Sequence, residues 1–155
     1  MIYAKCIQGS QIANDKNEFN LRTNEKYHVY CLGETTKSYN GMEILYCVPL
    51  NFIYDCLKYG RYIAIIDIPD FDNESYIKKC SYMGLHKACK EQHVLKIMDS
   101  CSKEAIDFVF NEVKNLELIH DGYLHFLPQE LQYYFKSLKN DFNEEFIWDK
   151  EDLSV

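Results

Sequence analysis

Residues 61–68 constrain the fold more than any other segment, because they combine β-forming side chains with almost continuous apolarity. An apolar run of this length is typical of a strand that is covered on both faces. Pro69 follows and ends the run, since proline has no amide hydrogen for a strand ladder. We therefore expect a central strand here, with packed layers on both of its sides.

A short helix is predicted just before this strand, over residues 49–58. Pro49 has the fixed φ angle that suits a first helical turn, and Gly60 ends the helix. Apolar residues recur between them at helical spacing: Phe52, Ile53, Cys56 and Leu57.

The rest of the N-terminal half is expected to be rich in strands. Alternating apolar positions predict strands over residues 1–7 and 18–31. The dipeptide Asn40-Gly41 is typical of a tight hairpin turn, and a strand over about 42–47 should follow it.

The second half changes to helical spacing. Apolar positions predict a helix over about 82–98. Ser102 is a candidate N-cap for a helix over 103–115, with Glu104 in the first turn, where a negative charge favours the helix dipole.

A hairpin and a last helix complete the predicted fold. Asp121-Gly122 divides residues 116–127 into two apolar runs with the spacing of a hairpin loop. Pro128 then opens a helix that ends near Lys139. The sequence thus predicts an α+β fold, with a β-rich N-terminal half carrying one short helix and a helical C-terminal half with a hairpin. We expect a single domain over residues 1–140.

Charge and cysteine usage exclude several classes of protein. The 17 Lys and Arg residues face 24 Asp and Glu residues, which gives a formal charge of −7 and argues against a protein that grips nucleic acid through its phosphates. The seven cysteines are odd in number and dispersed, so a disulfide framework is not expected. No run approaches the roughly 18 apolar residues of a membrane span. These features predict a cytoplasmic protein, or one inside a host cell if it is viral.

An acidic segment rich in aromatic side chains forms the C-terminal tail, residues 141–155. It holds six acidic residues and one lysine. Aromatic anchors among carboxylates are typical of a segment that docks on a basic partner. The candidate partner-binding residues are Phe142, Glu144, Glu145, Phe146 and Trp148. The alternative is that these aromatic side chains fold back onto the protein's own core.

Histidine and cysteine side chains are candidate metal ligands in the predicted helix over 82–98. His86, Cys89 and His93 would share one side of it, and thiolate with imidazole suits zinc. Cys80 or Cys101 would supply a fourth ligand. The spacing matches no common zinc module, and both residue types commonly occupy a half-buried helix face. We therefore predict no metal and keep these three residues as the alternative.

Residues 45–68 resemble the central segment of an uncharacterised domain found in phage proteins and at the front of giant-virus ankyrin-repeat proteins. That segment also reads as an apolar strand, a short helix ending near a tyrosine, and a second strand. Residues 84–95, with Gly84-Leu85-His86-Lys87-Ala88-Cys89, resemble an ankyrin motif. The strand-helix-strand order is similar to the centre of ADP-ribosyltransferase folds. That resemblance implies an NAD site, with Lys5, Tyr46, Tyr54 and Glu117 as its candidate residues.

Two classes of function follow from these observations. The chain contains no P-loop, dinucleotide fingerprint or serine-hydrolase motif. The first hypothesis is therefore a small viral or phage-type protein that acts by binding a protein partner, including one from a host system, without a cofactor. The alternatives are an ADP-ribosyltransferase-like enzyme that uses NAD, and a pocket that sequesters a nucleotide-like ligand.

Overall fold

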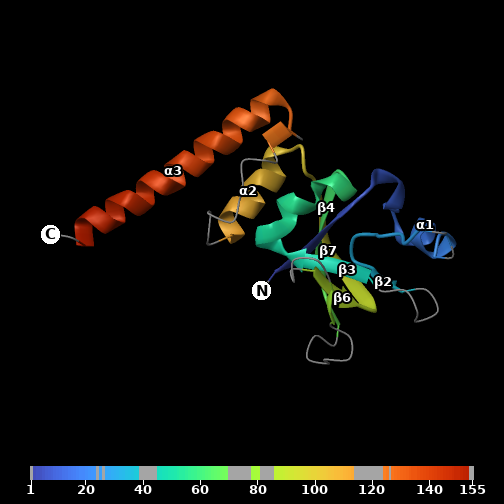
Figure 1. Ribbon diagram of the computed structural model, residues 1–155. Coiled ribbons are helices and arrows are strands. Elements are labelled where there is room, and N and C mark those ends of the chain that lie inside the picture. The colour runs from blue at the N-terminus through green and yellow to red at the C-terminus, as the bar shows by residue number, and fades with distance from the viewer. Residues whose placement is uncertain are drawn as a thin grey trace.

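The computed structural model describes residues 2–23, 25, 27–38, 45–69, 78–80, 86–113, 124–125 and 127–153. Within these ranges it describes only the backbone of 78–80, 86–88 and 142–153. The protein is a mixed α and β structure in which helices pack on an antiparallel sheet (Figure 1).

Seven strands join in one sheet in the order β2-β7-β4-β1-β3-β6-β5. Every pairing in it is antiparallel. The strands are β1 (Tyr3–Ile7), β2 (Thr35–Lys37), β3 (Leu45–Pro49), β4 (Tyr62–Asp67), β5 (Lys78–Cys80), β6 (His86–Cys89) and β7 (Glu91–Asp99). The expected central strand is confirmed, because β4 lies between β1 and β7 and pairs with both.

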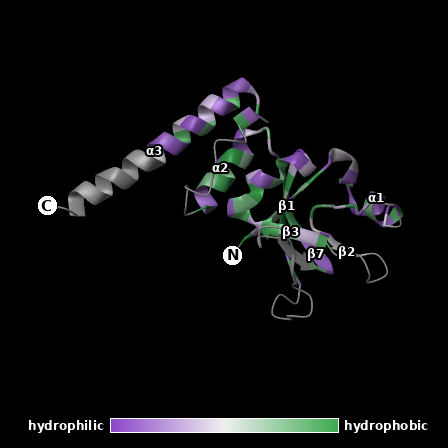
Figure 2. Ribbon diagram, viewed as in Figure 1, coloured by the Kyte–Doolittle hydropathy of each residue, from purple (hydrophilic) through white to green (hydrophobic). Residues whose placement is uncertain are grey.

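Helices cover one face of the sheet. They are the 3-10 helix η3 (Leu50–Tyr59), α2 (Lys103–Glu112) and α3 (Gln129–Leu153). Ile63 and Ile65 of β4 pack with them in an apolar cluster that reaches Phe135 of α3. In Figure 2, α2 and the central strands are coloured mainly as hydrophobic. This face therefore supplies the larger of the apolar clusters.

The opposite face carries a second cluster, so β4 is covered on both faces as predicted. Ala64 and Ile66 of β4 pack there with Tyr30 and Val94. Tyr30 comes from the segment that follows the 3-10 helix η1 (Gly9–Gln11) and the helix α1 (Lys16–Leu21). Its backbone bonds to that of Gln11, with Tyr30 N donating to Gln11 O over 2.7 Å. This bond ties the segment to η1.

The short helix before β4 is present, as a 3-10 helix that ends at Gly60. An added Cβ at Gly60 would lie 2.2 Å from the carbonyl carbon of Ile7, so any side chain there would collide with the backbone of β1. The Ser102 cap is also confirmed, because its side chain accepts a hydrogen bond from the backbone N of Ala105. The end of η3 and the start of α2 were therefore each predicted from a single residue, Gly60 and Ser102.

The predicted helix over 82–98 is wrong, because β6 and β7 occupy residues 86–99. Of the apolar positions that suggested the helix, Cys89 and Met98 are buried, whereas Leu95 is 54% exposed. Pairing shows that the segment is a strand: β7 hydrogen-bonds to β4 on one side and to β2 on the other. The sequence predicted that strands give way to helices near the middle of the chain. In the structure this change comes after Asp99, where β7 ends.

The predicted strand over 18–31 is wrong: helix α1 occupies its start, and the described residues after α1 form only an isolated bridge from Tyr30 to Ile12. Asp15 is the N-cap of α1 and accepts a hydrogen bond from the backbone N of Glu18 over 2.8 Å. A short polar side chain at this position satisfies an amide that the first helical turn leaves unpaired. The Asp-x-x-Glu spacing was the local signal for this start.

The last helix is longer than predicted. Helix α3 ends at Leu153, not near Lys139, so the acidic segment continues the helix. Figure 1 shows α3 running beyond α2 and away from the sheet. The Asn40-Gly41 and Asp121-Gly122 turns lie outside the described residues. In the described part of the chain, no helix has both the length and the apolar character needed to cross a bilayer.

Candidate ligand-binding pocket

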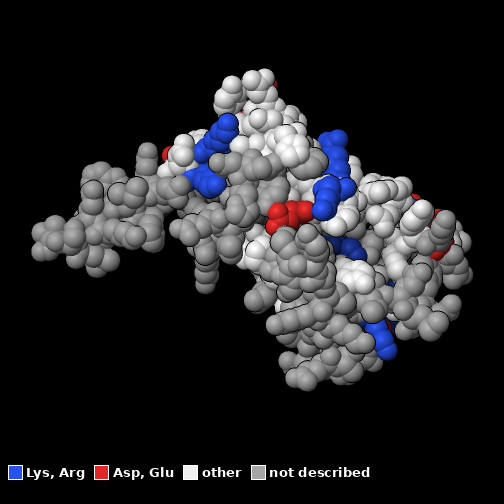
Figure 3. All heavy atoms as spheres, viewed as in Figure 1, with Lys and Arg blue, Asp and Glu red and all other residues white. Residues whose placement is uncertain are grey.

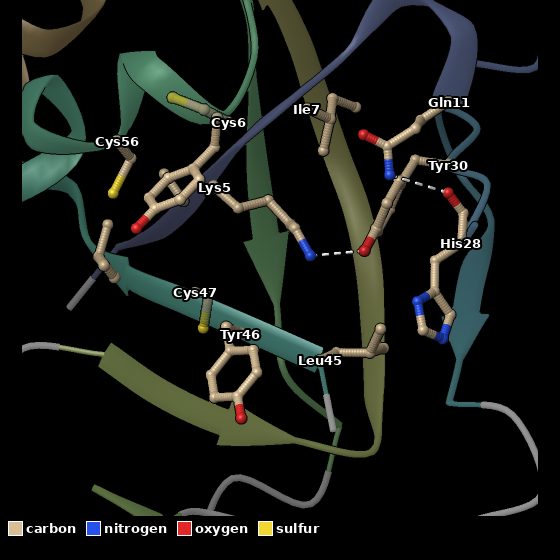
Figure 4. A pocket seen from close by; sticks show the side chains of 13 residues that line it. Lys5, Cys6, Ile7, Gln11, His28, Tyr30, Leu45, Tyr46, Cys47 and Cys56 are labelled. Atoms are coloured by element: carbon tan, nitrogen blue, oxygen red, sulfur yellow. Dashed lines mark hydrogen bonds between the residues drawn. The ribbon is translucent and has the colours of Figure 1, made fainter. Parts of the chain in front are cut away.

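A cavity of about 660 Å³ opens where β1 and β3 separate (Figure 4). The two strands pair only at Tyr3↔Pro49 and Ala4↔Val48. Beyond Ala4, β1 stays paired with β4 along its whole length, while β3 turns toward β6. Lys5 to Ile7 and Leu45 to Cys47 therefore face each other across a gap, and their side chains line it. The volume lies in the range of pockets that hold drug-sized molecules.

Lys5 is the charged side chain that enters this gap. Strand alternation places it on the same face as Tyr3 and Ile7, both of which are buried. Its Nζ donates hydrogen bonds to the hydroxyl oxygen of Tyr30 and, over 3.1 Å, to Oε1 of Gln92. Figure 4 shows the side chain extending from β1 across the gap to Tyr30. The sheet therefore directs an ammonium group into the interior.

The surroundings of Lys5 lower its pKa to about 8, and burial is the main cause. The neighbouring thiols of Cys47, Cys89 and Cys6 oppose that shift. Lys5 as a whole is half-buried and lines the cavity. No Asp or Glu lines the cavity within the part of the chain that the structure describes. The Lys5 ammonium is thus held by neutral partners.

Gln92 connects Lys5 to the thiols beneath it. Its side chain is fully buried. Nε2 donates to the carbonyl oxygen of Tyr46 over 3.1 Å and to Sγ of Cys89 over 3.3 Å. A hydrogen bond from Cys47 lowers the pKa of Cys89, and Gln92 and the charge of Lys5 add to this effect against the opposing effect of burial. One polar network therefore runs from Tyr30 through Lys5 and Gln92 to Cys89.

The residues implied by the ADP-ribosyltransferase resemblance are only partly brought together. Lys5 and Tyr46 both line the cavity. Tyr54 instead lies in the core beneath the helices, where its ring meets that of Phe135 edge to face at 5.4 Å. Burial there raises its pKa. Tyr54 is therefore a packing residue of the other layer, and Glu117 lies outside the described residues.

The candidate metal ligands do not share a helix face, because they lie on two strands. His86 and Cys89 belong to β6 and His93 to β7. His93 Nδ1 is in hydrogen-bond contact with Oγ1 of Thr35 at 2.9 Å, and the Cys89 thiol donates to the carbonyl oxygen of Leu45. Among the described side chains, no three His, Cys, Asp or Glu residues are grouped closely enough to hold a metal ion. The helical spacing that motivated this alternative is therefore wrong.

The candidate partner-binding residues lie in the distal part of α3. Phe142, Glu144, Glu145, Phe146 and Trp148 fall within Gln129–Leu153, and their side chains lie outside the described part of the structure. Their role remains a prediction.

Sequence reasoning missed the partners of Lys5. Tyr30 and Gln92 lie 25 and 87 positions from Lys5 in the chain, so no local spacing links them. One signal for Gln92 was present: a polar residue two positions before Val94 in a strand falls on the buried face. Because a helix was predicted over 82–98, this strand alternation was not recognised.

Figure 3 shows the described Lys and Arg side chains in separate places over the visible face of the molecule.

The chain matches no protein-family model, no curated protein and no solved structure. The pocket itself is therefore the basis for a functional proposal.

Proposed function

We propose that this protein binds a small anionic molecule of nucleotide-like size in the cavity between β1 and β3, with Lys5 as its counter-charge. The observation that carries the proposal is the Lys5 ammonium, which borders a cavity of about 660 Å³ and contacts only the neutral side chains of Tyr30 and Gln92 through its hydrogen bonds. A buried cation without an anion is costly, because burial disfavours the charged form. An anionic ligand would offset that cost.

The composition of the cavity supports an anion in preference to a cation. Lys5 is the charged residue among those that line it, in a chain whose formal charge is −7. The cation is therefore a local feature and not part of a generally basic surface. Gln11, His28 and Tyr30 add further hydrogen-bonding groups to the wall. Such a set would orient the polar part of a ligand.

Two tyrosines support a ligand that also has a planar part. Tyr46 and Tyr59 line the cavity and are 46% and 54% exposed. Exposed aromatic rings at the mouth of a pocket are suited to stacking on a ring system such as a nucleobase or nicotinamide. NAD is therefore one ligand of this class. Group transfer from NAD would need a carboxylate, and Glu117 is the candidate from the sequence.

Binding of this kind should depend on pH in a defined direction. An anion next to Lys5 favours the ammonium form, so binding takes up a proton when the free protein holds the neutral amine. Since the pKa of free Lys5 is about 8, affinity should fall as the pH rises above that value.

Thermal unfolding with added ligands tests the proposal. A ligand that binds only the folded state raises the unfolding temperature. AMP, NAD and ADP-ribose form the first panel, with adenosine as the uncharged comparison. We expect a shift with at least one anionic compound, none with adenosine, and loss of the shift in Lys5→Met. Lys37→Met is the control, because Lys37 is 72% exposed and lies outside the pocket. No shift with any anion at millimolar concentration would contradict the proposal.

We propose protein binding through residues 141–155 as a second activity. It is supported by the continuation of α3 to Leu153, well past Phe135, which is the buried anchor of this helix in the core. A helix that carries acidic and aromatic residues is suited to a basic groove on a partner. Deleting 141–155 should leave a folded domain with unchanged ligand binding and no capture of its partner from the native host. Unchanged capture would contradict this second proposal.

A further inference from the structure

We propose that Lys5 holds a carbonyl-containing ligand as a covalent imine, so that the pocket takes a small aldehyde or ketone that also bears an anionic group. This inference rests on the proposed function and adds the reactive group of the ligand to it. It is carried by the placement of Nζ between two acceptors at the edge of an open cavity.

The two hydrogen bonds of Lys5 account for two of the tetrahedral positions on Nζ. A neutral amine has two hydrogens, and Tyr30 and Gln92 offer two acceptors for them. The remaining tetrahedral position on Nζ then holds the lone pair. Nζ also lies 4.5 Å from the centre of the Tyr30 ring, which fixes the end of the side chain on one side. The amine is thereby oriented before any ligand enters, and oriented reactants react faster.

The groups around Lys5 favour a reactive amine. Those that face it are the hydroxyl of Tyr30, the amide of Gln92 and the thiols of Cys6, Cys47 and Cys89. None of these is a carboxylate that would hold the amine in its charged form. Burial is the largest influence on Lys5, and it lowers the pKa. A lysine with a lowered pKa supplies far more neutral amine near pH 7 than an exposed one does.

The reaction balances without any further reagent. The lone pair of Nζ adds to the carbonyl carbon while the C=O π pair moves to oxygen, and a proton passes from nitrogen to that oxygen, giving a carbinolamine. The nitrogen lone pair then expels the hydroxyl group, which leaves as water after taking up a second proton, and nitrogen loses its last hydrogen. The net change is an amine plus a carbonyl giving an imine plus water. The Tyr30 hydroxyl lies within hydrogen-bond distance of Nζ and is placed to relay these protons.

Covalent trapping on the whole protein tests this inference. Pyridoxal 5′-phosphate is the probe, because it joins an aldehyde, a planar ring and a phosphate. Reduction with cyanoborohydride converts an imine to a stable amine, and peptide mapping by mass spectrometry locates it. At limiting probe and pH 7 we expect Lys5 to be modified at least about tenfold more than exposed Lys37, because its lower pKa provides more neutral amine. Modification spread over the exposed lysines without preference for Lys5 would overturn the inference.

The pH dependence of trapping separates a reactive Lys5 from one that is merely accessible. The rate at Lys5 should level off above about pH 8, and the rate at the exposed Lys37 is followed over the same range for comparison. Thiols that add to the aldehyde give adducts that cyanoborohydride does not fix, so Cys47 does not contribute to the signal. Equal profiles at the two lysines would count against the inference.

A ligand without the carbonyl distinguishes this inference from the proposed function. Pyridoxine 5′-phosphate has the same ring and phosphate, with an alcohol in place of the aldehyde. If it raises the unfolding temperature while the aldehyde leaves Lys5 unmodified, the anion pocket stands and the imine is overturned. If neither compound shifts unfolding or modifies Lys5, both proposals fail. Lys5→Arg keeps a positive charge without a comparable nucleophile, so it should retain pyridoxine 5′-phosphate binding and lose trapping.

Discussion

The two faces of the sheet are built from the same strands but differ in what they bury. Beneath η3, α2 and α3, the core is apolar and aromatic, with Phe135 packed against Phe110 and Tyr54. On the opposite face, the same strand β1 buries Lys5, which is bonded to Tyr30 and Gln92. An apolar cluster stabilises the fold without any partner, whereas a buried ammonium reduces stability until an anion joins it. We infer that the apolar cluster beneath the helices maintains the fold, and that the Lys5 side of the sheet holds the anionic part of the ligand.

Truncation of the aromatic anchor on the helical face should have the largest effect on stability. Phe135 is 1% exposed, and its ring lies 5.0 Å from that of Phe110. Phe135→Ala should lower the free energy of unfolding by about 3–5 kcal/mol, because it removes a large buried side chain and leaves a cavity. Chemical denaturation measures this loss. Tyr133→Ala on the same helix is the control, since Tyr133 is 65% exposed and should change stability little. An equal loss of unfolding free energy in both variants would show that Phe135 does not anchor α3 in the core.

Replacement of Lys5 should change how the free energy of unfolding depends on pH. Below pH 8 both folded and unfolded chains hold the Lys5 proton, so the cost of burying the charge is fully present. Between pH 8 and 10.5 the folded protein has released that proton and the unfolded chain still holds it. The free energy of unfolding of the wild type, relative to Lys5→Met, should therefore rise by up to about 3 kcal/mol over this window.

Paired denaturation curves at pH 7 and pH 10.5 measure that rise. Titrating groups that do not contact Lys5 are common to both proteins and cancel in the difference. Lys37→Met should show no such trend, because Lys37 is exposed. A constant difference between the wild type and Lys5→Met at both pH values would mean that the ammonium is well solvated.

Substitutions at two glycines test whether a change in the backbone near the pocket affects ligand binding. An added Cβ at Gly60 would lie 2.2 Å from the Ile7 carbonyl carbon, while Gly33 has open space but a φ of 82°. Gly60→Ala should cost about 1–3 kcal/mol through displacement of β1, which also borders the pocket. Gly33→Ala should cost about 1–2 kcal/mol through backbone strain alone. Only Gly60→Ala should weaken ligand binding. Thermal unfolding with and without ligand separates the two.

The smallest expected effect is at the start of α2. Ser102→Ala removes the side-chain oxygen that accepts from the Ala105 amide over 3.2 Å. Loss of such a cap costs about 1 kcal/mol. Ligand binding should be unchanged, because this helix lies on the face away from Lys5. Ser102→Asp is the matched variant, since it keeps a capping oxygen and should restore stability. A change in ligand affinity would show that the two faces are coupled.

Local signals predicted the helical face better than the pocket. The continuous apolarity of β4, the Ser102 cap and the glycine after η3 were all visible in short stretches of sequence. A helix was predicted over 82–98 because Cys89, Leu95 and Met98 fit helical spacing, and the pairing of β7 with β4 and β2 is not visible in local spacing. Lys5 and Tyr46 were candidates through a family resemblance. Tyr30 and Gln92 were not, because the fold alone brings them to Lys5.

The charge state of Lys5 is the central claim, and its titration by NMR in protein carrying ¹³C-labelled lysine measures it directly. Comparison with Lys5→Met assigns the signal. We predict a midpoint near pH 8 in the free protein and a higher midpoint when pyridoxine 5′-phosphate is bound, because the anion favours the ammonium form. A midpoint near that of an ordinary exposed lysine, about 10.4, both with and without the ligand would contradict the account.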